Sequence, residues 1–189
     1  MKDISGGLLI WTSSFISNHT QRVIYRGATS SSTAVLAGVP QGSVLGPTLF
    51  TIYIDSVTRN LNCIPFLYAD DITLLQPIHR PADYTSLQAD LDVCHRWTEE
   101  HQLPVNTAKS CTMTFTGPCR PREIPVLTFG GREIRRVIST TVLGVELDSR
   151  LSFAPHVHRT VARSRRMLGF VTRSTVGMPP RRLDSCTLP

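Results

Sequence analysis

The 189-residue sequence predicts an α+β fold, in which helices pack on one face of a mainly antiparallel sheet. Segments with apolar residues at helical spacing alternate with short apolar runs that end at glycine, proline or aspartate, a pattern typical of helices and hairpins. Hydrophobic residues make up 41% of the chain, and the mean hydropathy is close to zero, so a sizeable core can be buried. The length suits one domain, or one domain and part of another.

Four helices are predicted in chain order, over residues 7–18, 44–61 and 82–102, and from residue 155 onward. Strands are predicted at 21–25, 32–37, 64–67, 72–75, 111–116, 127–129, 133–134 and within 137–147. The first helix is expected to face the core. In the third, Leu87, Leu91, Cys94 and Trp97 form the predicted buried stripe, and Asp90 is expected to lie away from it. This helix is predicted to be scaffold, and residues 178–189 an irregular end.

The charge of the chain is unevenly distributed. Residues 120–189 contain thirteen arginines and five acidic residues, whereas residues 1–119 have a net charge of −2. In the last helix, four arginines share the side opposite the apolar residues: Arg159, Arg163, Arg166 and Arg173. Arginine binds phosphate well, so this stripe predicts contact with a nucleic-acid backbone. An ordinary solvated helix surface is the alternative.

The five cysteines show no C-x-x-C spacing, which argues against a disulfide framework or a structural zinc site. Buried free thiols in a reducing compartment are expected instead. The apolar run at residues 8–11 is too short for a signal peptide, and no stretch approaches a membrane span. The sequence therefore predicts an intracellular protein, nuclear or cytoplasmic, that is not secreted and has no membrane partner.

The most informative feature is the carboxylate pair Asp70-Asp71, between apolar runs at 64–67 and 72–75. The pattern predicts a hairpin with both acids at its tip. Adjacent carboxylates repel each other, so a chain that presents them together is expected to bind a divalent cation, Mg²⁺. Ordinary turn chemistry is the alternative for an Asp-Asp pair.

A second motif, Gly38–Pro47, contains Pro40, Gln41, Gly42 and Ser43 ahead of the second helix. Glycine lets a substrate approach the backbone, and glutamine offers both a donor and an acceptor. Together with the acidic hairpin, this loop indicates nucleotidyl transfer.

These two motifs, with Phe50, Ile52–Ile54 and Phe66–Asp71, resemble the palm of a reverse transcriptase. The closest resemblance is to the non-LTR, LINE-like retrotransposon branch. Further segments resemble the family in its own order over about residues 4–176: 106–109, 143–148 and 151–156. The resemblance implies a partial right-hand polymerase palm over residues 1–150 and the truncated start of a helical thumb over 151–189.

The resemblance also implies roles for individual residues. Asp70 would bind metal, with Asp71 its less direct neighbour, and Tyr68 would pack near the primer end. Pro40, Gln41, Gly42 and Ser43 would line the pocket of the incoming nucleotide. Lys109 would lie near the triphosphate, although an exposed lysine with no such role is an equal alternative.

The implied activity is RNA-directed DNA polymerisation by two-metal transfer to a primer 3′-hydroxyl. Its cofactor would be Mg²⁺, and its partners an RNA template, a DNA primer and deoxynucleoside triphosphates. The sequence gives no oligomeric state.

One departure from the family bears on activity. The family's palm begins with a strand that carries another essential aspartate, which should precede the 7–18 helix, and neither Asp3 nor Asp55 matches it. The fingers segments also have no counterpart. We therefore expect the isolated chain not to polymerise. The alternative to a polymerase segment is an inactive retrotransposon remnant with residual nucleic-acid binding.

Overall fold

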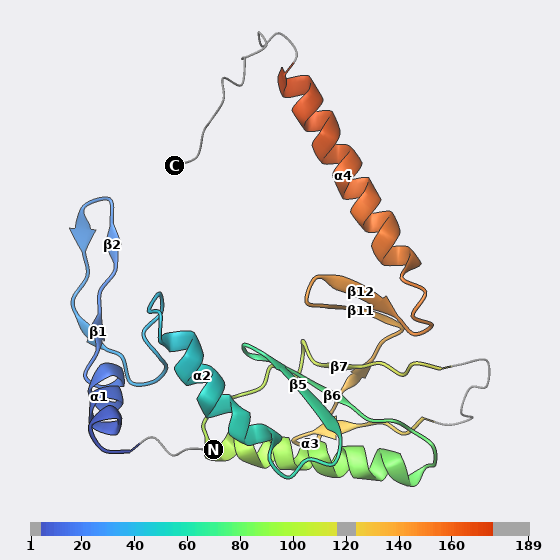
Figure 1. Cartoon of the computed structure of the whole chain (residues 1–189), viewed down its shortest axis with the longest axis horizontal. Helices are drawn as coiled ribbons and strands as arrows, with labels where there is room; N and C mark the ends of the chain where they lie inside the picture. The colour runs from blue at the N-terminus through green and yellow to red at the C-terminus, as the bar shows by residue number, and fades with distance from the viewer. Residues whose placement is uncertain (1–4, 117–123, 176–189) are drawn as a thin grey trace. The chain divides into compact units, whose positions relative to one another are not determined.

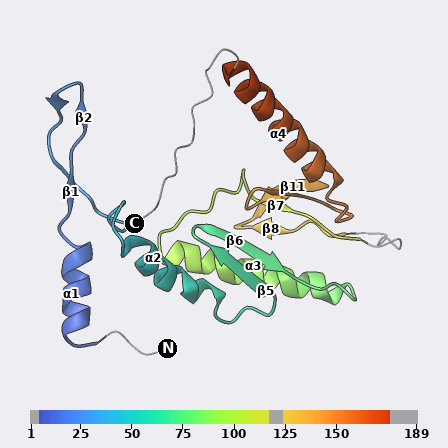
Figure 2. The same cartoon turned by 45° about the horizontal axis from the view of Figure 1, so that its top comes forward.

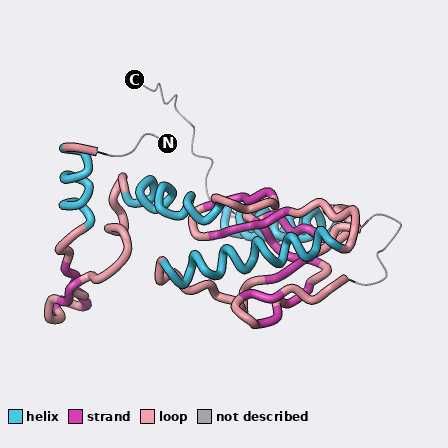
Figure 3. Tube along the Cα trace, turned by 90° about the horizontal axis from the view of Figure 1, so that it is seen from below, coloured by secondary structure: helices cyan, strands magenta, loops and turns pink. Residues whose placement is uncertain are grey.

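The computed structural model describes residues 5–116 and 124–175, and the chain divides into two compact units, Met1–Pro104 and Val105–Pro189. Each unit mixes helices with short paired strands, which confirms the α+β class (Figures 1 and 3). The described strands form six two-stranded ladders, five of them antiparallel, rather than the single sheet that was expected. The predicted palm–thumb boundary at residue 150 falls inside the second unit.

The first unit opens with helix α1 (Gly7–Ile16) and a long hairpin. The hairpin contains two ladders, β1 (Thr20–Gln21) with β4 (Thr33–Ala34) and β2 (Ile24–Tyr25) with β3 (Ala28–Thr29). The expectation that α1 faces the core is wrong for the described chain, because none of its residues is buried and Trp11 is 51% exposed. Four consecutive apolar residues, 8–11, encircle this helix, so they mark no single face for packing.

The second helix is shorter than its predicted span. Helix α2 (Gly46–Ile54) continues as the 3₁₀ helix η1 (Asp55–Thr58). Here Ser56 Oγ donates to the carbonyl oxygen of Tyr53, and Thr58 Oγ1 to that of Asp55. Such side-chain bonds compete with the helical ladder, which explains why the α-helix ends before residue 61.

The hairpin of β5 (Ile64–Tyr68) and β6 (Asp71–Leu75) lies beside helix α3 (Ala82–Glu100), as Figures 1 and 2 both show. The core of this unit consists of Ile54, Val57, Cys63, Tyr84, Cys94 and two polar residues, Asp90 and Thr98. The predicted position of Asp90 away from the buried stripe is wrong, because the residue is only 1% exposed. Its carboxylate is buried because main-chain N–H groups bind it, as described below.

The cysteines within the described residues, Cys63, Cys94 and Cys111, are free thiols as expected. Burial and the neighbouring Asp90 carboxylate raise the pKa of Cys63 to about 12 and that of Cys94 to about 11. Both buried thiols therefore stay protonated at neutral pH.

The second unit contains β7 (Cys111–Thr112), β8 (Thr128–Phe129), β9 (Arg132–Glu133), β10 (Arg135–Arg136), β11 (Ser139–Val142), β12 (Val145–Asp148) and helix α4 (Ala154–Thr175). The predicted hairpin around Gly130-Gly131 is confirmed as β8–β9. The predicted strand region at 137–147 contains two strands, β11 and β12, which form a hairpin that turns at Leu143-Gly144. Strand β7 is shorter than predicted and pairs in parallel with β10. Residues 178–189 lie outside the described residues.

Helix α4 has no buried residue, and the side chains of both its apolar and its arginine side are exposed, although the helix contacts β12. No helix among the described residues has both the length and the apolarity that a membrane span requires.

Candidate functional site

The predicted acidic hairpin is confirmed, with its tip at Ala69-Asp70. Strands β5 and β6 pair over five residue pairs, from Ile64 with Leu75 to Tyr68 with Asp71. Ala69 begins the two-residue turn with a φ of +51°, a conformation that favours glycine. An alanine there costs about 1–2 kcal/mol, so the ladder holds the turn against its own strain.

The two faces of this hairpin differ in exposure. Because strand side chains alternate, Tyr68 and Asp71 lie opposite each other on one face, which is exposed. Leu67 and Ile72 pair on the other face and are half-buried. The tip therefore presents a carboxylate beside Tyr68, a residue that is 64% exposed.

The donor set at the tip fits a hydrated Mg²⁺ ion. Asp70 and Asp71 are adjacent, exposed and offer hard carboxylate oxygens. Across residues 5–116 and 124–175, no group of three or more histidine, cysteine or acidic side chains is arranged to hold a metal. The described chain thus supplies two carboxylates here, and Mg²⁺ is often bound through one or two, together with water and substrate phosphates.

The chain entering the hairpin is bound by a carboxylate of α3. The N–H of Cys63 donates to Asp90 Oδ2 at 2.7 Å, and the N–H of Asn62 lies 3.1 and 3.0 Å from the two oxygens. Asn62 Nδ2 adds a bond of 3.1 Å to Oδ1. Burial by itself would raise the pKa of Asp90, but these hydrogen bonds outweigh it and hold the pKa below the usual value.

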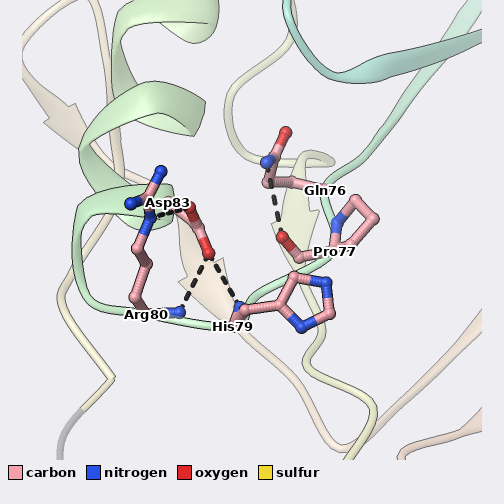
Figure 4. Close-up of polar contacts among 5 residues, drawn as sticks. All are labelled: Gln76, Pro77, His79, Arg80 and Asp83. Atoms are coloured by element: carbon pink, nitrogen blue, oxygen red, sulfur yellow. Dashed lines mark hydrogen bonds and ion pairs between the residues drawn. The ribbon is translucent and has the colours of Figure 1, made fainter.

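The chain leaving the hairpin is bound by a second carboxylate of the same helix (Figure 4). Asp83 Oδ2 accepts from the N–H of His79 at 2.7 Å and from that of Arg80 at 2.9 Å. The Arg80 guanidinium lies 3.4 Å from Asp83 Oδ1. The two backbone bonds are the main reason why the pKa of Asp83 is lowered.

Aromatic contacts join the end of α3 to α2 and η1. The Trp97 ring stacks on His101 with centroids 4.1 Å apart, and Tyr53 lies 5.8 Å from Trp97. Trp97 Nε1 donates to Ser56 Oγ at 3.0 Å, and the Tyr53 hydroxyl donates to the His101 carbonyl oxygen at 3.3 Å. These contacts fix α2 against α3.

The predicted nucleotide loop is a tight turn in front of α2. The Ser43 N–H donates to the Pro40 carbonyl oxygen at 3.3 Å, and Gly42 has a φ of +81°, as a type II turn requires. Ser43 Oγ donates to that same carbonyl at 2.7 Å and accepts from the Gly46 N–H at 3.0 Å. Gln41 and Gly42 are exposed at the apex.

Gly46 allows this loop to fold back so closely. A Cβ atom at this position would lie 2.9 Å from Ser43 Oγ and 3.0 Å from the Pro40 carbonyl oxygen. Gly46, the third glycine of the motif, is therefore required by close packing rather than by a special backbone angle.

The remaining predicted site residues belong to the second unit. Lys109 is exposed, and its N–H donates to Asn106 in a turn ahead of β7. Arg159 lies 3.0 Å from Glu146 Oε2 of β12, so this arginine also anchors α4 to the β11–β12 hairpin. Arg163, Arg166 and Arg173 are exposed along the same helix.

The structure thus gathers Tyr68, Asp70 and Asp71 at one tip, and Pro40–Ser43 in one turn of the same unit. Lys109 and the four arginines lie in the other unit. Their predicted functional roles remain predictions.

The family model described as reverse transcriptase (RNA-dependent DNA polymerase) matches residues 3–171, which include all of these site residues except Arg173. The chain belongs to the reverse transcriptase family. The match spans both the acidic hairpin and the Pro40–Ser43 turn, in agreement with the resemblance noted from the sequence.

Named relatives place the chain in the LINE-like, non-LTR branch. An RNA-directed DNA polymerase from the mobile element jockey of Drosophila melanogaster is 33% identical over 79% of this chain and 17% of that protein. The jockey polymerase of Drosophila funebris is 35% identical over 69% of the chain and 15% of that protein. A putative 115 kDa protein in the type-1 retrotransposable element R1DM of D. melanogaster is 28% identical over 91% of the chain and 17% of that protein.

The chain therefore spans less than a fifth of the length of these relatives. No solved structure matches the chain significantly.

Sequence reasoning missed the two carboxylates that bind the base of the hairpin. For Asp90 a signal was available, because Asp90, Cys94, Trp97 and His101 follow one another at spacings of four, three and four, which is one helix face. An aspartate that shares a face with buried residues predicts a buried carboxylate with hydrogen-bond donors around it.

Proposed function

We propose that this chain carries the cation-binding hairpin and the nucleotide loop of an RNA-directed DNA polymerase that extends a primer 3′-hydroxyl. The observation that carries the proposal is the Asp70-Asp71 pair on a strained, firmly paired turn, within a chain of the reverse transcriptase family. The polymerase names of its relatives favour this function over an inactive remnant.

Asp70 and Asp71 would hold the divalent cation on which the family in general depends. The cation supplies charge stabilisation for the attacking and leaving oxygens of phosphoryl transfer. The chain's own part is to keep two carboxylates at one fixed apex, with the exposed Tyr68 ring beside them for the primer end.

The turn Pro40–Ser43 would receive the incoming nucleotide. Its exposed apex, Gln41-Gly42, offers an amide side chain and a backbone without a Cβ atom, and Ser43 is occupied in holding the turn. Lys109 would neutralise charge on the departing pyrophosphate.

The exposed arginines of α4 would bind the backbone of the template–primer duplex. In this proposal residues 1–150 form part of a polymerase palm and residues 151–189 the beginning of a thumb. Because an RNA template, a DNA primer and deoxynucleoside triphosphates are found inside cells, the proposed reaction would take place there.

A primer-extension assay on an RNA template tests the function. Because the chain spans under a fifth of its relatives, residues 3–171 replace the matching segment of the D. melanogaster jockey polymerase, with and without Asp70→Asn. We expect Mg²⁺-dependent extension that Asp70→Asn reduces at least about a hundredfold.

Asp92→Asn is the matched control, because Asp92 is an exposed aspartate of α3 that bonds only its neighbour Gln88 in the described contacts. It should extend primers as well as the parent. Extension that survives Asp70→Asn would contradict the proposal. The isolated chain, assayed in parallel, tests the expectation that it does not polymerise alone.

A further inference from the structure

Two carboxylates of helix α3 bind the chain segments that enter and leave the β5–β6 hairpin. Asp90 binds the N–H groups of residues 62 and 63, just before β5, and Asp83 binds those of residues 79 and 80, after β6. Asp83 and Asp90 are seven positions apart, which is two helical turns, so both lie on one side of α3.

The Asp90 carboxylate, which binds the chain before β5, is buried, and both of its oxygens accept hydrogen bonds. Asp90 is 1% exposed, and Cys63, which donates the 2.7 Å bond, is 5% exposed. Removing this carboxylate would leave main-chain donors in the core without an acceptor. An asparagine would offer a single acceptor oxygen, and its amide group would face the donors.

The Asp83 carboxylate after β6 lies nearer the surface. Asp83 closes the connection between β6 and α3 through two backbone bonds, with the Arg80 guanidinium beside it (Figure 4). The lowered pKa of each aspartate is consistent with a carboxylate that stays ionised while it accepts these hydrogen bonds.

A two-stranded hairpin has little stability by itself, and its direction is set by whatever holds its base. The entry and the exit lie at the same open end of β5–β6, opposite the Ala69-Asp70 turn. Binding both chain ends to one rigid helix therefore fixes where the tip points.

We propose that Asp83 and Asp90 are positioning residues that clamp the base of the β5–β6 hairpin to α3 and so set the place of Asp70 and Asp71. That the tip holds a catalytic cation rests on the proposed function, whereas the clamp itself rests on the hydrogen bonds at the base of the hairpin.

The test uses the full, ¹⁵N-labelled chain with Asp90→Asn and Asp83→Asn, and Asp92→Asn as the matched control on α3. Amide hydrogen exchange reports on the clamp, and Mn²⁺ broadening of the Asp70 and Asp71 amide signals reports on the tip. All variants are compared under conditions in which α3 keeps its exchange protection.

We expect Asp90→Asn to speed amide exchange along β5 and β6 as far as Tyr68 and Asp71. We also expect it to raise the Mn²⁺ dissociation constant at the tip about tenfold. Asp83→Asn should change both quantities in the same direction, and Asp92→Asn neither. The Mn²⁺ constant is the readout that separates positioning from a merely structural role.

Faster exchange confined to residues 62 and 63, with unchanged exchange along the strands, would overturn the clamp. Unchanged Mn²⁺ affinity despite a loosened hairpin would overturn the positioning role. A parent chain that shows no Mn²⁺ effect at the tip would count against the proposed function, and the exchange rates would then still decide the clamp.

If Asp90→Asn fails to fold, Asn62→Ala replaces it, because it removes one donor from the same carboxylate and leaves α3 unchanged. This variant should loosen the hairpin in the same direction by a smaller factor. Hairpin exchange equal to that of the parent would overturn the clamp.

Discussion

Ala69 holds a left-handed backbone conformation at the apex of the hairpin, with a φ of +51°. Replacing it with glycine relieves strain of about 1–2 kcal/mol but gives the unfolded chain more freedom. We predict that Ala69→Gly raises the free energy of unfolding by about 0.5–1 kcal/mol, measured by urea denaturation. Ala89→Gly, within α3, should instead lower it by about 1 kcal/mol. A loss of stability in both variants would show that the turn is not strained.

Gly46 lets the Pro40–Ser43 turn pack closely against the start of α2. Gly46→Ala places a Cβ atom 3.0 Å from a backbone carbonyl that cannot easily move, so we predict a loss of about 1–3 kcal/mol in thermal or urea unfolding. Gly169→Ala in α4 is the matched control. Its Cβ atom meets only the flexible end of Arg173 at 3.3 Å, and it should stabilise by up to about 1 kcal/mol. Equal effects at the two positions would contradict this account of Gly46.

The buried carboxylate of Asp90 makes the free energy of unfolding depend on pH at acidic pH. Its pKa is lowered in the folded protein, so its contribution is fully present above the unfolded-state value of about 3.9 and is lost as the pH falls through the folded-state value. The neighbouring thiols of Cys63 and Cys94 stay neutral throughout this range, because their pKa values are raised to about 12 and about 11.

We therefore predict a constant difference in unfolding free energy between the parent chain and Asp90→Asn from pH 5 to 7. The difference should shrink below about pH 4, as the parent carboxylate takes up its proton. Urea unfolding at pH 7, 5 and 3 measures it. A difference that grows at low pH would mean that Asp90 is not held as a carboxylate.

At the scale of elements, α4 combines an anchor with an arginine surface. Arg159 is paired with Glu146, whereas Arg163 and Arg166 are exposed on the same side. We predict that Arg163→Ala and Arg166→Ala each lower the slope of log affinity against log salt for RNA by about 1, measured by fluorescence anisotropy.

Arg80→Ala is the charge-matched control, because Arg80 lies in the first unit beside Asp83. Its slope should equal that of the parent. If Arg80→Ala and Arg166→Ala weaken RNA binding equally, net charge rather than the α4 surface is responsible.

The sequence predicted the elements whose signals are local. The acidic hairpin, α3 and the Gly130-Gly131 turn appear where strand pattern, apolar stripe and turn residues placed them. The end of α2 was missed because Ser56 and Thr58 bond to the backbone instead of extending the helix. The spacing of Asp90 from Cys94 and Trp97 marks it as part of the buried face, but its partners could not be predicted, because they are main-chain groups 27 and 28 residues away.

At the scale of the whole molecule, the chain belongs to the reverse transcriptase family, and we propose that Asp70 and Asp71 hold its catalytic cation. The most direct measurement is a Mn²⁺ titration of the ¹⁵N-labelled full chain, with the Asp70→Asn and Asp92→Asn variants beside it. The account predicts signal broadening centred on residues 68–72, lost in Asp70→Asn and unchanged in Asp92→Asn. Broadening centred elsewhere, or kept in Asp70→Asn, would contradict it.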